Sequence, residues 1–393
     1  MKTATTMASL LMALCLFAGD SHAEQGQADD IGPIPPGYRP ASNTDESELW
    51  YIEAKQEVEL KQSPRLIRDP ELNAYVRRVT CKVTGDYCKD LRIYILDVPY
   101  FNAMMTPSGI MVIWSGALLR IQNEAELALI IGHEFGHFKN RHSLQQFRKI
   151  KKSGAFLNTF GVLTYGTGAD LVANLIGIAS LQKFSRDHER EADKTGFSTV
   201  VNNGYDPRVG ALLWDRMLQE EKAADYGKPL PVFASHPKSQ ERRDDLQAAA
   251  AAIDNPSSQR DAEAYRHETE KFQQQWLEGE LSRRMYQSSI VVMTELLSVS
   301  PAEHKGLYTF FLAEAHRRKN KEGDRAKADE LYAQATQLPD APSGAWREYG
   351  LALKSANNKP AALAALNRYL ALDPKADDRL FIEQYLKELQ VAP

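Results

Sequence analysis

Apolar residues recur at helical spacing along most of this chain. The first such pattern begins at Asp45, from which Leu49, Val58 and Leu60 are spaced to fall on one buried side. A second helix is predicted to start near residue 70, because Asp suits the cap position there and Pro suits the first turn. A third begins at Asn123, which can cap it, and continues through a strongly apolar stretch to residue 138.

Two short stretches are instead typical of strands. Leu91–Asp97 alternates and contains β-branched and aromatic residues, and Ile110–Trp114 follows a turn at Thr106–Gly109. A small sheet among many helices indicates an α+β domain, which we place at residues 45–255.

Residues 258–393 differ in character and are predicted to be entirely helical. Six of them fall at positions 4, 8, 11, 20, 24 and 32 of a 34-residue tetratricopeptide pattern, namely Trp346, Gly350, Leu353, Ala362, Leu366 and Pro374. Ala328, Tyr332 and Ala335 fit the preceding unit, and a degenerate third unit ends near Pro301. Stacked helix pairs offer a concave surface suited to a protein segment, and a helical cap without a partner is the alternative.

The first 23 residues have the three parts of a secretory signal peptide. Lys2 makes a basic start, an apolar run of about a dozen residues follows, and a small-x-small end favours cleavage after Ala23. A lipid anchor at Cys15 is disfavoured because Leu14 is too large for that signal. We therefore expect an exported protein, with residues 24–44, rich in Pro and Gly, as an extended or disordered leader.

Composition narrows the function. With 48 basic and 52 acidic residues the net charge is −4, which gives no indication of nucleic-acid binding. Of three cysteines, only Cys81 and Cys88 lie outside the signal peptide. In an oxidising compartment we expect them to form a disulfide, and a metal site with ligands from elsewhere is the alternative.

His133, Glu134 and His137 carry the candidate chemistry. Histidines four residues apart project from one face of a helix and can hold zinc. The carboxylate of Glu134 can take a proton from an attacking water and pass it to a leaving amine. This pattern predicts amide-bond hydrolysis, and two histidines satisfied in a core helix are the structural alternative.

A catalytic zinc typically has three protein ligands. Glu189 and Asp193 lie four residues apart and can both face the metal from a second helix. We assign Glu189 as the third ligand and Asp193 as the acceptor that orients a ligating histidine. Spacing alone leaves His188 open as a rival ligand, whereas Glu191 would point about 200° away around the helix.

These paired motifs, HExxH at 133–137 and ExxAD at 189–193, resemble the zinc metalloprotease family that includes the HtpX heat-shock protease and the CAAX prenyl endopeptidases. The resemblance covers about residues 45–250. It implies a mostly helical zincin-type domain with one zinc per chain, and it favours Glu189 over His188. The spanning helices of those proteases are not found in this sequence, so a membrane-embedded prenyl protease is disfavoured.

His236, Pro237 and Arg242 resemble the His-Pro-x-x-x-x-Arg element of the family's periplasmic β-barrel assembly-enhancing branch. In that branch the histidine is implied to be a removable fourth zinc ligand that holds the enzyme latent. Alternatively, the His-Pro pair only starts a helix at residues 240–252. Arg242 would either bind an oxyanion or pair with an acid such as Asp193.

The predicted protein is thus a periplasmic zinc metalloendopeptidase followed by an all-α tetratricopeptide-repeat domain. The branch resemblance implies misassembled outer-membrane proteins as substrates and the β-barrel assembly machinery as a partner of the repeats. A chaperone or scaffold with a largely silent metal site is the alternative.

Strand 110–114, if it lies at a sheet edge beside the metal, could pair with an extended substrate. The apolar segment 154–182 is interpreted as helices packed around the site, with a substrate-gripping or membrane-facing flap as the alternative, so peripheral membrane contact stays open.

Overall fold

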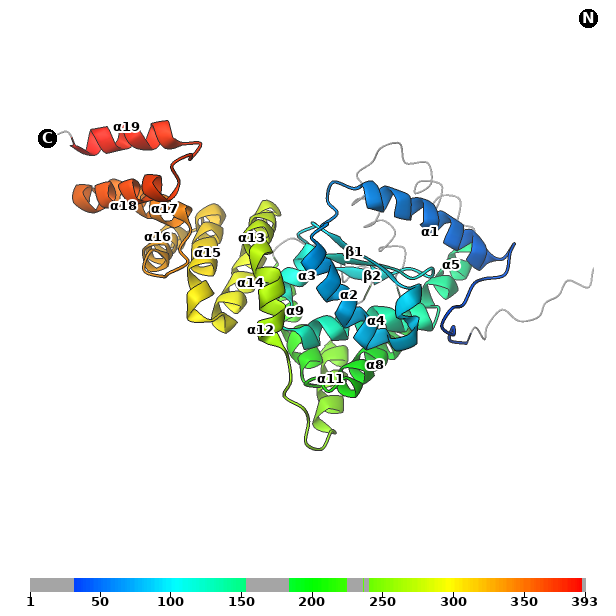
Figure 1. The fold of residues 1–393 in the computed structure, drawn as a ribbon. Helices are drawn as coiled ribbons and strands as arrows, with labels where there is room; N and C mark the ends of the chain where they lie inside the picture. The colour runs from blue at the N-terminus through cyan, green and yellow to red at the C-terminus, as the bar shows by residue number, and fades with distance from the viewer. Residues whose placement is uncertain (1–31, 153–183, 225–235, 237–239, 391–393) are drawn as a thin grey trace, which may run out of the picture. The chain divides into compact units, whose positions relative to one another are not determined.

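The computed structural model describes residues 32–152, 184–224, 236 and 240–390 (Figure 1). Up to residue 251 its elements are α1 (Asp45–Gln62), α2 (Pro70–Thr84), the 3-10 helix η1 (Gly85–Asp90), β1 (Arg92–Leu96), β2 (Ala103–Met105), β3 (Ile110–Trp114), α3 (Ser115–Arg120), α4 (Glu124–Lys139), α5 (His142–Lys152), α8 (Arg186–Asn202), α9 (Val209–Ala223) and α11 (Gln240–Ala251). The predicted signal peptide and the apolar segment 154–182 lie outside the described residues.

The described part after residue 260 is helical. Its elements are α12 (Ala262–Thr269), η2 (Glu270–Phe272), α13 (Gln273–Ser282), α14 (Tyr286–Val299), η3 (Ala302–His304), α15 (Lys305–Lys319), α16 (Asp324–Ala335), α17 (Ser343–Ser355), α18 (Lys359–Leu372) and α19 (Arg379–Gln390). A mostly helical domain with a small sheet, followed by an all-helical region, confirms the predicted fold class.

The sheet has the order β1-β3-β2, with β1 parallel and β2 antiparallel to the central β3. One face carries Met104, Val112 and Trp114 and packs under Leu60 of α1. The other face joins the main core with α2 and α4, so helices cover both sides (Figure 1). Both predicted strands are confirmed, but the structure adds β2. Because β3 is central, residues 110–114 offer no free edge, and the edge strand in contact with α4 is β2.

Helix α1 begins where it was predicted, but the prediction of its buried face is wrong in part. Val58 is 54% exposed, whereas Glu53 and Glu57 are buried. Glu53 accepts a hydrogen bond from the backbone N–H of Ser108 at 2.8 Å, and Glu57 accepts one from Nε of Arg92 at 2.9 Å. These partners satisfy the carboxylates, which is why two acids can replace apolar residues against the sheet.

The leader, predicted to be extended or disordered, packs against the domain where the structure describes it. Ile34 is buried in the main core, and its backbone N–H donates to the carbonyl of Lys139 at 3.0 Å. Its carbonyl accepts a hydrogen bond from the Tyr87 hydroxyl at 2.7 Å. The Tyr38 hydroxyl accepts one from Arg141 at 2.8 Å. One apolar anchor and these bonds are enough to hold a segment without helix or strand against the domain.

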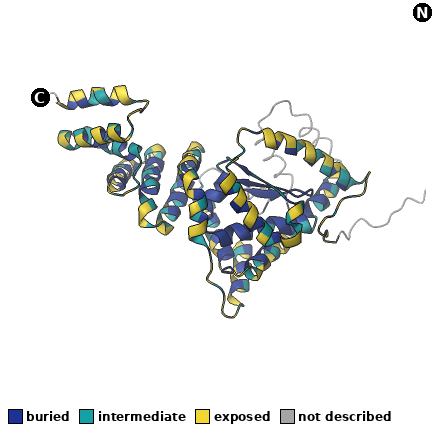
Figure 2. Ribbon diagram, viewed as in Figure 1, coloured by how far each residue is buried: buried dark blue, intermediate teal, exposed yellow. Residues whose placement is uncertain are grey.

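Helix α4 is the centre of the domain, and Figure 2 shows it almost entirely buried, in contrast to α1. Asn123 caps it by accepting from the backbone N–H of Glu126 at 3.0 Å, as the sequence predicted. The main core cluster continues from α4 through α13, α14 and α15 to α16. The helices after residue 260 therefore share the core of the helices that precede them.

A buried ion network reinforces this junction. Arg120 at the end of α3 donates to Glu220 of α9 at 2.6 Å and to Glu280 of α13 at 2.8 Å, and Arg283 completes the network on Glu280 at 2.6 Å. All four side chains are at most 5% exposed, so each charge depends on its partners for solvation.

In the C-terminal part, α15 packs on α16 and α17 on α18, as expected for stacked helix pairs. Gly350 of α17 lies close against α18, because a Cβ there would lie 2.7 Å from Cδ2 of Leu366. The two positions are those of the predicted repeat. That these pairs are tetratricopeptide repeats stays a prediction.

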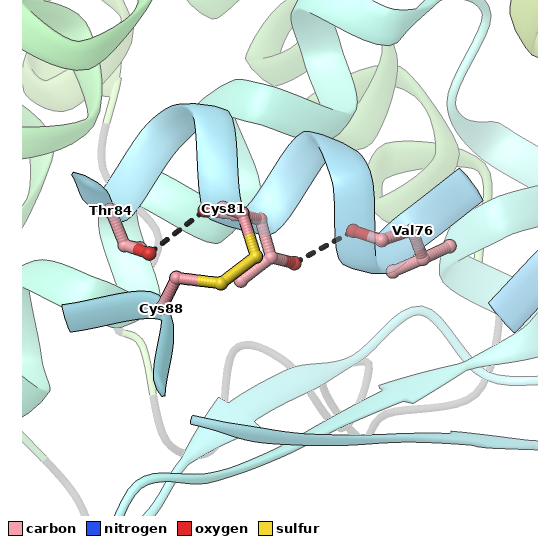
Figure 3. The surroundings of a disulfide bond; sticks show 5 residues. Val76, Cys81, Thr84 and Cys88 are labelled. Carbon is pink, nitrogen blue, oxygen red and sulfur yellow. Dashed lines mark hydrogen bonds between the residues drawn. A yellow bond between two sulfur atoms is a disulfide. The ribbon is translucent and has the colours of Figure 1, made fainter. Parts of the chain in front are cut away.

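Cys81 of α2 and Cys88 of η1 form a disulfide (Figure 3). Beside it, the hydroxyls of Thr80 and Thr84 donate to the backbone carbonyls one turn earlier at 2.8 and 2.9 Å, which keeps both polar groups satisfied inside the helix. The bond closes the end of α2 onto the turn that leads into β1, and it consumes both thiols that the alternative metal site would have needed.

Candidate metal centre

Four side chains of metal-binding type meet between α4 and α8. His133 and His137 lie one turn apart on α4, Glu189 comes from the first turn of α8, and His236 stands just ahead of α11. One nitrogen or carboxylate oxygen from each lies within 4.8 Å of all the others. His137, Glu189 and His236 are buried. The cluster contains all three predicted ligands and the predicted fourth.

Glycines let the two helices approach closely enough for this. Gly132 and Gly136 of α4 face Gly196 and Ala192 of α8. A Cβ on Gly136 would lie 2.9 Å from Cα of Ala192, and one on Gly196 would lie 3.0 Å from the carbonyl oxygen of Leu129. A side chain at any of these three glycines would push the helices apart, so the glycines set the distance between the histidines and Glu189.

The spacing of the polar atoms fits a tetrahedral metal ion. Nε2 of His133 lies 3.1 Å from Nε2 of His137 and 3.3 Å from Nδ1 of His236, whose own distance to Oε1 of Glu189 is 3.0 Å. The two α4 histidines lie 3.6 and 3.7 Å from the carboxylate oxygens of Glu189. Four ligand atoms at about 2.0–2.1 Å from a tetrahedral zinc would stand roughly 3.3 Å apart, in the middle of this range.

Asp193 fixes the orientation of one ligand. Its Oδ1 accepts from Nδ1 of His133 at 2.9 Å, which leaves Nε2 of that ring to face the cluster. Arg242 holds Asp193 with two bonds of 2.6 Å and also contacts Glu189 at 2.5 Å. Burial alone would raise the pKa of Asp193, but Arg242 and His133 hold it well below its usual range. Of the two predicted roles for Arg242, the structure places its guanidinium in the ion pair with Asp193.

His142 and Glu191 form a second such arrangement, which the sequence did not suggest. Nδ1 of His142 lies 2.9 Å from Nδ1 of His137, and its Nε2 lies 3.1 Å from Oε2 of Glu191. Glu191 points away from the cluster, as its helical position required. His188, the rival ligand, stacks on His142 with ring centroids 4.2 Å apart and bonds Gln145 at 3.1 Å, so it lies outside the ligand set.

The pKa values of the cluster reflect burial and mutual charge. Burial, and then the neighbouring histidines, hold the pKa of His137 well below its usual value, so its ring is neutral. Burial raises the pKa of Glu134 against the opposing effect of His236 and His133. Burial would lower the pKa of His236, but the carboxylates of Glu189 and Glu134 outweigh it and raise that pKa. A neutral imidazole and a carboxylate of raised basicity are the forms that metal binding and proton abstraction need.

Glu134 lies on the far side of His236 from the other three ligands. Nε2 of His236 is 3.6 Å from Oε1 of Glu134, while Nδ1 of the same ring faces the cluster. The imidazole therefore stands between the carboxylate and the metal position, where an attacking water would have to be.

A cavity opens beside His133 and Glu134. Its polar lining also includes Asp193, His236 and Arg242. The rest of the lining is apolar and comes from three elements: Phe101 and Ala103 at β2, Leu129 and Ile130 of α4, and Leu213, Trp214 and Met217 of α9. The β2–β3 ladder bonds Asn102 to Trp114 and Thr106 to Ile110, so the intervening backbone groups of Ala103 and Met105 point away from β3. An extended chain could pair there with its side chain in the cavity.

A mostly helical zincin-like fold with a His-Glu-x-x-His helix, a buried His-His-Glu-His cluster and an adjacent cleft is typical of the metallopeptidase class. Residues 66–250 match peptidase family M48, so the chain contains a domain of that family.

The chain is similar to three curated proteins of this kind. It is 25% identical over 263 residues to the putative beta-barrel assembly-enhancing protease of Vibrio cholerae, covering 63% of this chain and 52% of that protein. It is 31% identical over 152 residues to the mitochondrial metalloendopeptidase OMA1 of Arabidopsis thaliana, covering 38% and 30%. With the beta-barrel assembly-enhancing protease of Escherichia coli K12 it shares 22% identity over 205 residues, covering 49% and 42%. The chain thus spans about half the length of these relatives, or less.

Among the helices that the structure describes, none combines the length and apolarity needed to cross a membrane.

Proposed function

We propose that this protein is a periplasmic, zinc-dependent metalloendopeptidase held latent by His236. The observation that carries the proposal is the position of Glu134. It lies one residue from a two-histidine clamp, has a raised pKa, and is separated only by the ring of His236 from the point where His133, His137 and Glu189 converge. We assign those three residues as the zinc ligands and Glu134 as general base and then acid.

When bound, zinc would act as a Lewis acid that activates water and polarises the scissile carbonyl. The chain's residues do the rest. The outward backbone groups of Ala103 and Met105 bind the substrate as an added strand. Glu134 takes a proton from the attacking water and delivers it to the leaving amine. Asp193 keeps the proton on Nδ1 of His133, so that Nε2 stays a ligand.

His236 would be the switch. Its ring stands between Glu134 and the other three ligands, so it occupies the place that the attacking water needs. It is followed after six residues by Arg242, which is tied to Asp193. Displacement of His236 alone would open the metal position and leave the pair of Arg242 and Asp193 in place.

The substrate class follows from the relatives rather than from the site. Two of them are named for β-barrel assembly, and the third is a metalloendopeptidase of mitochondria. We propose that this chain hydrolyses misassembled outer-membrane proteins. The division into a signal peptide at 1–23, a protease domain at 45–255 and a repeat domain at 258–393 that docks the assembly machinery is part of the same proposal.

The test compares zinc content and casein hydrolysis of the full chain and its variants. The wild type should hold about one zinc and cleave slowly, and His236→Ala should cleave faster because the fourth ligand is gone. Glu134→Gln should keep its zinc but lose about 10²-fold or more in rate, since the proton acceptor is removed. His188→Phe, a histidine outside the ligand set, serves as the control and should match the wild type.

A scaffold that acts through its helical repeats is the second candidate, favoured by the four-residue ligand set, which leaves a tetrahedral metal without an open position. If wild type, His236→Ala and Glu134→Gln all bind zinc and none cleaves casein, the latency proposal fails and the scaffold takes precedence. If no variant binds zinc, the metal assignment itself is wrong.

A further inference from the structure

His142 is a fully buried histidine that the proposed chemistry does not use directly. It is the first residue of α5, and the preceding residue, Arg141, has a left-handed φ of 58° that turns the chain back towards α4. Arg141 is held in this conformation by ion pairing with Glu46 and a bond to Tyr38. The turn places the ring of His142 beside His137, with the two Nδ1 atoms 2.9 Å apart.

The direction of the hydrogen bonds follows from the ligand position. Nε2 of His137 faces the cluster and must be bare to bind a metal, so its proton is on Nδ1 and is donated to Nδ1 of His142. The proton of His142 is then on its Nε2, where it is donated to Oε2 of Glu191 at 3.1 Å. In the reverse direction His142 would donate to Nδ1 of His137. The ring proton of His137 would then be on its Nε2, where it would block the atom that binds the metal.

We propose that His142 and Glu191 are positioning residues that hold His137 in the tautomer and ring orientation required for metal binding. This rests on the proposed metal site. The carboxylate polarises His142, which in turn polarises His137 and raises its basicity as a ligand. Asp193 acts on His133 in the same way without an intermediate ring.

Helix α8 therefore supplies the carboxylates that polarise both histidine ligands of α4, His133 and His137. Glu189 on α8 joins the cluster, Glu191 reaches His137 through His142, and Asp193 contacts His133 directly. The side chain of Glu191 is 55% exposed and that of Asp193 12%, so water screens the first interaction more strongly. We call the chain of hydrogen bonds from Glu191 through His142 to His137 the relay. The carboxylate of Glu191 should contribute less to zinc affinity than the buried ring of His142.

The test is the zinc dissociation constant of the full chain, measured by competition with a chelator of known affinity. His142→Phe keeps a ring of similar size on His188 but removes the acceptor, and it should weaken zinc binding about 10- to 100-fold. His142→Asn can present its Oδ1 near the former Nδ1 and should recover much of this loss. Glu191→Ala should weaken binding severalfold, and Glu191→Gln, which keeps an acceptor oxygen, should do so less.

His188→Phe is the matched control, because it makes the same exchange in the other ring of the stack and touches no ligand. It should bind zinc as the wild type does. The relay is overturned if His142→Phe binds zinc as tightly as the wild type. It is also overturned if His142→Asn and His188→Phe both bind zinc as weakly as His142→Phe, because disturbed packing would then explain the loss of affinity. Should His142→Phe fail to fold, wild-type affinity in Glu191→Ala would still reject the carboxylate's role. Failure of the wild type to bind zinc would refute the proposed function instead.

Discussion

Replacing Gly136 by alanine tests whether the glycine crossing of α4 and α8 sets the geometry of the metal centre. In an uncrowded helix this change stabilises by about 1 kcal/mol. Here the added Cβ would lie 2.9 Å from Cα of Ala192 and 3.0 Å from Cβ of Thr195, well inside the roughly 3.5–4.0 Å at which carbon atoms pack best. The helices would have to separate by several tenths of an ångström or more.

Overpacking of this kind costs about 1–3 kcal/mol, so the variant should be less stable than the wild type despite its better helix propensity. Glu189 lies one turn before Ala192 on α8 and would move away from His137 with it, so we also expect zinc affinity to fall about tenfold, as for displaced ligand shells. Chemical denaturation and the zinc competition assay measure the two effects. Gly210→Ala is the control, because its nearest neighbour is a flexible tip of Leu246 at 3.3 Å. If Gly136→Ala is as stable as Gly210→Ala and binds zinc normally, the crossing does not control the site.

Two further predictions concern a buried acid and the cleft. Burial raises the pKa of Glu53 to about 7 from an ordinary 4.5, so its contribution to stability is present below pH 4.5 and is lost as the pH rises to 7. The free energy of unfolding of the wild type should therefore fall by about 3 kcal/mol between pH 4 and 8 through this group, and Glu53→Gln should not show that loss. Chemical denaturation at both pH values measures it, and a stability difference between the two proteins that is the same at pH 4 and pH 8 would contradict the prediction. In the cleft, Leu213 and Met217 favour a large apolar side chain beside the scissile bond. In the His236→Ala background, kcat/KM for peptides with Leu there should exceed that for Ala by about 10- to 100-fold, and Leu213→Trp should abolish this preference; equal rates would show that the cavity is no subsite.

Local signals in the sequence predicted much of the fold. The caps of α2 and α4, the strands at 92–96 and 110–114, and the face shared by His133 and His137 each depend on residues a few positions apart. Strand β2 has only three residues, too few for a periodicity to show. Its existence depends on pairing with β3, which no local pattern encodes.

Features set by distant partners were missed or misjudged. Glu53 lies inside because Ser108, 55 residues later, supplies its hydrogen bond, and the pattern of α1 alone favoured Val58. His142 and Glu191 are 49 residues apart, and neither belongs to a recognisable motif. A histidine five residues after the HExxH pair and an acid two residues after Glu189 were the available signals, but their pairing becomes apparent only when α8 crosses α4.

The ligand set has a consequence for the lifetime of the protein. With zinc bound as proposed, it would cross-link three distant parts of the chain, because Glu189 lies about 50 residues from His137 on one side and 47 from His236 on the other. By analogy with a disulfide, each closed loop of this size removes about 4 kcal/mol of entropy from the unfolded chain. Release of His236 would open one of the two loops and leave the other closed. If His236 is the proposed switch, its release would free residue 236 from α8, and the active form would then be more easily degraded than the latent one.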